Sequence, residues 1–141
     1  METKVITEKD LVKNPDTGLY EYNANFQFEG NVEIAENLGC VKFGYGLVVT
    51  GYIYAKAGTG IEAGAGIKAG WGIEAGEGIK AGEGIEAGEG IVTWYYGGIV
   101  SKWVISPRIA VGFYLGPDKV QTIKAEIRKE TPIILGKVEV P

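Results

Sequence analysis

A repeat of six residues constrains the fold of this chain more than any other feature of its sequence. Between Gly60 and Ile91 the sequence reads GIEAGA GIKAGW GIEAGE GIKAGE GIEAGE GI, so isoleucine recurs at every sixth position from Ile61 to Ile91. A short and fixed period indicates that one small structural unit stacks on copies of itself. The repeat therefore predicts a solenoid.

The spacing within each hexad predicts strands and not helices. Ile61 and Ala63 stand two residues apart, so an extended chain points both to one side and Glu62 to the other. On a helix, isoleucines six residues apart would be rotated by about 600° from one another and would form no apolar stripe. The two glycines in each hexad also disfavour a helix. We therefore predict an all-β, single-domain parallel β-solenoid, also called a β-helix.

Three glutamates mark places where the chain is expected to turn. Strict alternation would point Glu77, Glu83 and Glu89 inward with the isoleucines, and burying an unpaired carboxylate is costly. The chain must therefore bend at these residues. Each glutamate has a glycine on both sides, and we expect these glycines to supply the backbone φ freedom that turns the glutamate outward.

The charge pattern predicts three hexads in each coil. If a coil held two hexads, stacked neighbours would be twelve residues apart and Glu62 would lie beside Glu74. If it holds three, neighbours are eighteen residues apart and opposite charges meet in each column. The predicted pairs are Lys56–Glu74, Glu62–Lys80 and Lys68–Glu86. Because a slip of one hexad would bring like charges together, this pattern specifies the register of the stack.

The same period continues less regularly on both sides of the central repeat. It shifts by two residues before Ile61, and after Ile91 it resumes with hexads that begin at Ile99, Ile105 and Val111. Residues 26–116 are therefore predicted to form the solenoid, with about five coils, which is more than the minimum of about three repeats that such stacks need.

Two segments outside this range are predicted to close the ends of the stack. Residues 1–25 contain the turn signal NPDTG at positions 14–18 and indicate an N-terminal hairpin or cap. Residues 117–141 contain two predicted strands, Val120–Arg128 and Ile133–Val140. A solenoid exposes strand edges at its ends. We therefore expect the C-terminal strands to form a cap or a dimerisation element, and the protein to be a homodimer.

Residue types that are missing exclude several classes of enzyme. The 141 residues include no histidine, whereas acyltransferases and carbonic anhydrases built on left-handed β-helices depend on histidine for catalysis or zinc binding. The central repeat also lacks the aspartates that calcium-binding roll repeats require. We therefore predict no catalytic, cofactor-binding or metal-binding residues, and no enzymatic activity. The single cysteine, Cys40, is expected to be a small residue of the core.

The sequence predicts a cytoplasmic protein that does not contact a membrane. The first four residues, Met-Glu-Thr-Lys, lack the apolar core of a signal peptide. The apolar stretch after Ile91 is interrupted by Lys102, Pro107 and Arg108 before it reaches the length needed to span a bilayer.

The surface of the repeat is the remaining candidate for function. Residues 60–91 carry six glutamates and two lysines, and three aromatic residues follow at positions 94–96. Tyrosine and tryptophan often anchor protein interfaces, and an acidic surface repels nucleic acid but can imitate it for a basic partner. The predicted binding surface consists of Glu77, Glu83, Glu89, Trp71, Trp94, Tyr95 and Tyr96. The alternative for the aromatic residues is that they fill the core or pack beneath a cap.

Two parts of the chain resemble known families. The Gly-Ile-Glu-Ala-Gly run at residues 58–91 resembles glycine-rich repeats in small proteins of bacteria, phages and mobile elements. Residues 28–57 are similar to bactofilin-type polymer-forming β-helices, because aliphatic residues such as Val32, Ile34 and Val41 alternate there.

These resemblances imply two different functions. Together with the acidic surface, the resemblance to glycine-rich repeats predicts a phage or mobile-element inhibitor in the cytoplasm of a bacterial host. Such an inhibitor would bind a host nucleic-acid-binding defence protein through a surface that mimics DNA. Its partner is an unidentified protein, and we expect no direct binding of nucleic acid. The second resemblance implies the alternative, a self-assembling scaffold of the cytoskeletal type.

Overall fold

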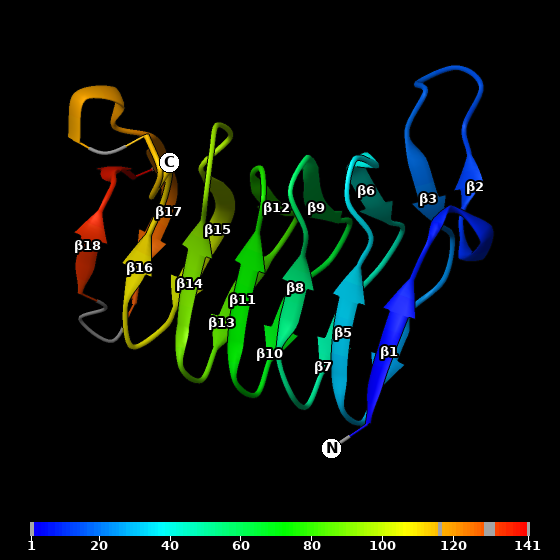
Figure 1. The fold of residues 1–141 in the computed structure, drawn as a ribbon. Coiled ribbons are helices and arrows are strands. Elements are labelled where there is room, and N and C mark those ends of the chain that lie inside the picture. The colour runs from blue at the N-terminus through cyan, green and yellow to red at the C-terminus, as the bar shows by residue number, and fades with distance from the viewer. Residues whose placement is uncertain (1, 116, 129–131, 141) are drawn as a thin grey trace.

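The computed structural model describes residues 2–115, 117–128 and 132–140, and it shows a parallel β-solenoid of about five coils. Each coil contributes a strand to each of three faces, which confirms the predicted fold class. In Figure 1 the strands of the first face run upward in front, the chain descends behind them, and the coils advance from right to left. The solenoid is therefore right-handed.

The first face is a sheet of seven strands, all joined in parallel. In spatial order its strands are β1 (Thr3–Ile6), β5 (Asn31–Ile34), β8 (Ile53–Ala55), β11 (Gly72–Ala75), β14 (Gly90–Thr93), β16 (Ile109–Ala110) and β18 (Ile133–Leu135).

The second and third faces form one sheet, because two long strands, β15 (Ile99–Ile105) and β17 (Thr122–Ile127), pass from one face to the other. The other strands of the second face are β2 (Val12–Lys13), β3 (Tyr20–Tyr22), β6 (Gly39–Phe43), β9 (Thr59–Ala63), β12 (Ile79–Ala81) and β19 (Lys137–Glu139). Those of the third face are β4 (Phe26–Phe28), β7 (Leu47–Val49), β10 (Ile67–Ala69) and β13 (Gly84–Ala87). Two short 3-10 helices, η1 (Glu8–Asp10) and η2 (Pro117–Lys119), lie outside these strands.

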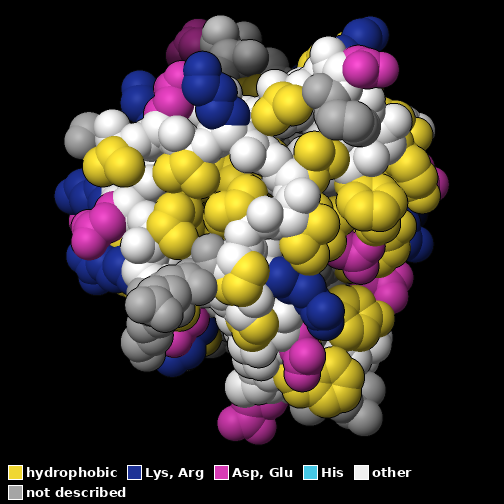
Figure 2. All heavy atoms as spheres, turned by 90° about the vertical axis from the view of Figure 1, so that its left-hand side faces the viewer, with side chains coloured by type: hydrophobic (Ala, Val, Ile, Leu, Met, Phe, Trp, Pro, Cys, Tyr) yellow, Lys and Arg dark blue, Asp and Glu magenta, His cyan; other side chains and the backbone are white. Residues whose placement is uncertain are grey.

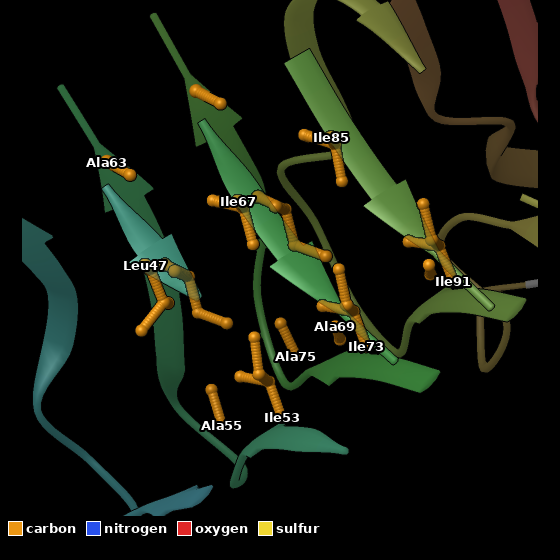
Figure 3. Packing of buried hydrophobic residues seen from close by; sticks show 14 of the residues in the cluster. Leu47, Ile53, Ala55, Ala63, Ile67, Ala69, Ile73, Ala75, Ile85 and Ile91 are labelled. Atoms are coloured by element: carbon orange, nitrogen blue, oxygen red, sulfur yellow. The ribbon is translucent and has the colours of Figure 1, made fainter. Parts of the chain in front are cut away.

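The isoleucine and alanine of each hexad fill the interior. Ile61 and Ile85 are completely buried, and Ala63 is 2% exposed. Figure 3 shows such side chains, contributed by different strands of the coils, packed together inside the stack. Toward the N-terminal end larger side chains replace alanine, and the rings of Phe26 and Phe43 lie 5.8 Å apart between centroids. The core is therefore narrow in the central coils and fuller at this end.

The central coils have the register that the charge pattern predicts. Glu62 lies beside Lys80 on neighbouring strands, and Lys68 lies beside Glu86. The Lys68 Nζ and Glu86 Oε2 atoms are 3.7 Å apart. Because this pair is exposed to water, it contributes less than about 1 kcal/mol to stability, so its role is to specify the alignment of the coils.

The third predicted charge pair, Lys56–Glu74, is wrong. Glu74 lies beside Tyr54, because Ile73 pairs with Ile53 at a separation of twenty residues and not eighteen. The two additional residues lengthen the turn before Thr59. Lys56 instead reaches back to Glu33 of the preceding coil, with 3.5 Å between Nζ and Oε1.

The predicted hexad that begins at Ile105 is displaced by one residue. Val104, which is completely buried, lies beside Ile85, and Ile105 lies beside Glu86 on the outer side of the strand. The bend inside β15 uses one residue fewer than a regular hexad. The next spacing, from Val104 to Ile109, is also five residues, so Ile109, and not Val111, pairs with Ile91 on the first face.

The parallel ladders extend beyond residues 26–116 in both directions. At the N-terminal side β1 pairs in parallel with β5, and β3 pairs with β6. The segment between β1 and β3 contains η1 and the strand β2, which pairs with β3 in the antiparallel direction as a hairpin. At the C-terminal side β18 and β19 continue the first and second faces.

The glycine that follows each inward alanine is required for space. A Cβ atom on Gly64 would collide with the carbonyl oxygen of Gly44 one coil away, and a Cβ on Gly82 would collide with that of Gly64. The prediction that glycines flanking the outward glutamates supply φ freedom is wrong, since none of the six has a positive φ. They instead leave space for the neighbouring coils: a Cβ on Gly76, Gly78, Gly82 or Gly88 would collide with backbone atoms, and one on Gly84 would collide with the Trp103 ring.

This steric requirement predicts different effects for two glycine-to-alanine changes in the same repeat. Gly64→Ala should destabilise the fold by roughly 1–3 kcal/mol, because backbone atoms must move to accept the methyl group. Gly72→Ala should change stability by less than about 1 kcal/mol, because its Cβ would lie 3.5 Å from its nearest neighbour, the carbonyl oxygen of Gly90. Urea unfolding followed by circular dichroism measures both changes. Equal midpoints for the two variants would contradict the steric explanation.

Candidate functional site

Three edges separate the faces of the solenoid, and the three predicted glutamates lie on different edges. Glu77 lies between β11 and β12, where the first face meets the second. Glu83 lies between β12 and β13, where the second face meets the third, and Glu89 lies between β13 and β14, where the third meets the first. Edges of a three-sided coil point in different directions. The structure therefore does not bring the three carboxylates together in one acidic face.

The surroundings of the three glutamates also differ. Glu83 and Glu89 are exposed, and Glu77 is half-buried. Glu83 makes an ion pair with Lys102 of the next coil, with 3.4 Å between Oε2 and Nζ. Glu89 shares its edge with Trp71, whose carbonyl oxygen accepts a 2.8 Å hydrogen bond from the Glu89 N–H. The Trp71 side chain is 50% exposed. Because its edge lies between the third and first faces, the whole first face separates it from the other predicted aromatic residues.

The edge between the first and second faces holds the remaining predicted residues, and we call it the aromatic edge. It consists of Glu77, Trp94, Tyr95, Tyr96, Phe113 and Tyr114. The N–H of Tyr95 donates to the carbonyl oxygen of Gly76, so Tyr95 stacks one coil beyond the Glu77 turn.

Two rings of the next coil complete the aromatic cluster, and the sequence prediction missed them. The Tyr114 ring stacks on Trp94 with 4.8 Å between centroids and 27° between planes, and Phe113 meets Trp94 edge-to-face at 5.5 Å. The Tyr114 N–H donates to the Trp94 carbonyl oxygen at 2.9 Å, so the rings are aligned by the main-chain ladder. Tyr114 follows Trp94 by twenty residues, which is also the length of the coil from Ile53 to Ile73. This spacing is the sequence signal that could have identified the additional rings.

The aromatic cluster lies at the surface. Tyr95, Tyr96, Phe113 and Tyr114 are between 41% and 65% exposed, and Trp94 is half-buried beneath them. The side chains of Trp94, Tyr95 and Tyr114 line a hollow of about 220 Å³. The hollow is also lined by Tyr54, Ala57 and Gly76. The alternative expectation, that these rings fill the core, is therefore not met.

Cys40 lies on the outer side of the second face, and the expectation that it belongs to the core is wrong. In β6 the inward residues are Val41 and Phe43, both completely buried, so alternation directs Cys40 outward. Cys40 lies beside Gly60 in a groove of about 230 Å³. Burial raises the pKa of its thiol above the ordinary value, and Glu62 raises it further, whereas the lysines nearby lower it.

The described part of the chain shows no arrangement for metal chemistry. Within it, no three cysteine, aspartate or glutamate side chains group closely enough to hold a metal ion. Its buried side-chain polar atoms all have hydrogen-bond partners, so no unsatisfied group points into a cavity. No helix in the described ranges is long and apolar enough to cross a bilayer.

Comparison of the chain with protein-family models, with curated proteins and with solved structures gave no match. The class of the protein, a right-handed parallel β-solenoid with an aromatic edge, therefore rests on its own structure.

The environment of Cys40 predicts the pH dependence of its alkylation. Glu62→Gln should lower the thiol pKa and increase the rate at neutral pH, because the thiolate is the reactive form and this carboxylate disfavours it. Lys80→Gln should have the opposite effect, since Lys80 favours the thiolate. Mass spectrometry of iodoacetamide labelling across the titration range gives the rates. If the wild-type thiol titrated at or below the pH of a free cysteine, the assigned environment would be incorrect.

Proposed function

We propose that this protein is a non-enzymatic binding module that recognises another protein through its aromatic edge. The observation that carries the proposal is the exposed cluster of Tyr95, Phe113 and Tyr114 around Trp94, beside a hollow. Large aromatic side chains next to a pocket are the residues that most often dominate binding energy at protein interfaces. On the same edge the preceding coils carry only small or charged side chains at positions 56–58 and 76–78, so the cluster is local.

The position of the cluster supports this role. It occurs where the regular hexad ends, in turns that are longer than those of the central coils. Added residues in a solenoid accumulate on its surface, where they can serve recognition without disturbing the core. A partner side chain that entered the hollow would contact Tyr95 and Tyr114 at once.

The more specific prediction, a phage or mobile-element inhibitor that acts in the bacterial cytoplasm by mimicking DNA, stays a prediction. Because Glu77, Glu83 and Glu89 occupy three edges, a single partner face would meet the carboxylates of one edge at a time. Glu77 is the one that adjoins the aromatic cluster, so it is the residue through which charge would assist binding. The likeness to glycine-rich repeats of phage proteins is the support for this narrower proposal.

A self-assembling scaffold is the second candidate, and the strand edges at the ends of the stack favour it. A continuous filament requires that each face of one copy continue into the next. At the N-terminal end the second face is closed by the antiparallel strand β2, which opposes end-to-end growth in that face. The bactofilin likeness thus supports this candidate less than the aromatic edge supports a binding module.

The proposal predicts that aromatic truncation accelerates dissociation from the partner. A partner captured from bacterial lysate on the wild-type protein should dissociate at least about tenfold faster from the Tyr95→Ala/Tyr114→Ala variant, because hot-spot rings hold the complex. Surface plasmon resonance gives the dissociation rates. The matched control is Tyr45→Ala, which removes an equally exposed ring, 58% accessible, on a different edge. Loss of the partner in the control, with retention in the double variant, would refute the aromatic edge.

Single glutamate variants test whether charge assists the same interface. Glu77→Gln should slow association at low salt by a few-fold, since charges at the rim of an interface mainly steer the encounter. Glu89→Gln, on a different edge, should leave the association rate unchanged. Both changes should leave the fold intact, because surface substitutions usually alter stability by less than about 0.5 kcal/mol. Equal association rates for wild type and Glu77→Gln would remove charge steering from the proposal.

A further inference from the structure

The outermost strand of the second face, β19, presents a free edge at the C-terminal end of the solenoid. Its inner side pairs in parallel with β17, where the Lys137 N–H donates to the Gln121 carbonyl oxygen at 2.9 Å. Backbone groups of successive residues in a strand point to opposite sides, so the N–H and C=O of Val138 point away from β17. Among the described residues, no strand pairs with this outer edge of β19.

The other end of the same face shows how such an edge is closed. There the outermost parallel strand is β3, and β2 pairs with it in the antiparallel direction, with Val12 beside Glu21. The antiparallel β2 ends the parallel ladder, and because it is only two residues long it leaves a very short edge strand, which is one way in which proteins blunt a sheet edge. The edge of β19 lacks a strand of this kind within the described part of the chain, although it offers the same unpaired backbone groups.

The sequence of β19 is complementary to itself in the antiparallel direction. Ile123 is completely buried and lies beside Val138, so Val138 is on the inward side of the strand, and Lys137 and Glu139 are on the outward side. If a second β19 ran antiparallel with Val138 opposite Val138, each Lys137 would face a Glu139 of the other copy. Cross-strand pairs of opposite charge stabilise antiparallel strands, and the central valines would exchange both of their free hydrogen bonds.

We propose that β19 pairs antiparallel with β19 of a second copy of this chain, which gives a closed, twofold symmetric dimer joined at the C-terminal ends. Apolar side chains within the strand and directly after it are available for such a contact to cover: Val138 is 37% exposed and Val140 73%. Figure 2 looks onto this end and shows hydrophobic side chains across its middle, with charged side chains around and between them. A twofold contact uses the same surface on both copies, so assembly stops at two.

Charge reversal at the two ends of β19 tests the pairing. Lys137→Glu places two like-charge pairs across the dimer axis and should raise the dimer dissociation constant by roughly tenfold. Within one chain this variant creates no like-charge pair with β17, because the neighbour of position 137 on that strand is the uncharged Thr122. The double variant Lys137→Glu/Glu139→Lys restores opposite charges across the axis and should return the constant close to the wild-type value; it is made together with Lys124→Gln, because position 139 lies beside Lys124 on β17. Sedimentation equilibrium of the full chain at low salt, over a concentration series, measures all three.

Two further variants separate this contact from general effects of charge or folding. Lys9→Glu makes the same change of net charge on an exposed residue of the N-terminal region, and it should leave the dimer unaffected. Val138→Pro removes the N–H that donates across the axis while the ladder to β17 keeps its donors, and it should yield monomers with an unchanged circular dichroism spectrum. A monomeric wild type, a mass that grows beyond the dimer, or a double variant that dissociates as readily as Lys137→Glu would overturn the proposal.

Discussion

Parallel main-chain hydrogen bonds between successive coils are the interaction on which the rest of the structure depends. The Ile61 N–H donates to the Gly78 carbonyl oxygen at 3.0 Å, and the Ile79 N–H donates to that of Gly98 at 2.9 Å, one coil further on. Strands joined in this way lie about 4.8 Å apart. That spacing must be maintained at the turns as well as in the strands, and within the central repeat a Cβ on the residue after the inward alanine, as at Gly64, Gly70 and Gly82, would collide with the preceding coil. The low-complexity composition of the repeat is therefore a consequence of stacking.

The same ladder arranges equivalent residues in columns. The isoleucines form inward columns that exclude water, and the outward positions of the second face alternate in charge through Glu21, Lys42, Glu62 and Lys80. Such columns leave the faces of the central coils uniform. Distinct side chains can accumulate only where the period breaks, because a longer turn projects from an edge without changing the core. The aromatic edge arises in this way from the turns that follow Ile91 and Ile109.

The ends of the stack obey a different constraint. A coil in the middle has both of its edges paired, whereas the first and last coils each leave one edge open to another strand. The N-terminal segment closes the second face with its own hairpin. At the C-terminal end β19 follows in parallel, and its sequence of lysine, valine and glutamate would place opposite charges together with a second β19 if that strand ran in the opposite direction. The proposed recognition of a partner and the proposed association of two copies would thus use different surfaces, one along an edge and one across an end.

The sequence alone determined the solenoid, its three faces and the alignment of the central coils, because these follow from local alternation and from charges eighteen residues apart. Glu62–Lys80 and Lys68–Glu86 are correct for that reason. The pair Lys56–Glu74 and the hexad at Ile105 were wrong because turn length is set by how coils pack, and the residues of a turn carry no period. The bends at Glu77, Glu83 and Glu89, which separate these residues onto different edges, were already expected from the hexad, whereas only the tertiary structure showed that the handedness is right and that Phe113 and Tyr114 join Trp94. The aromatic contacts join residues about one coil apart, whose separation varies from coil to coil, and the handedness depends on the direction in which the coils advance; neither is fixed until the coils are stacked.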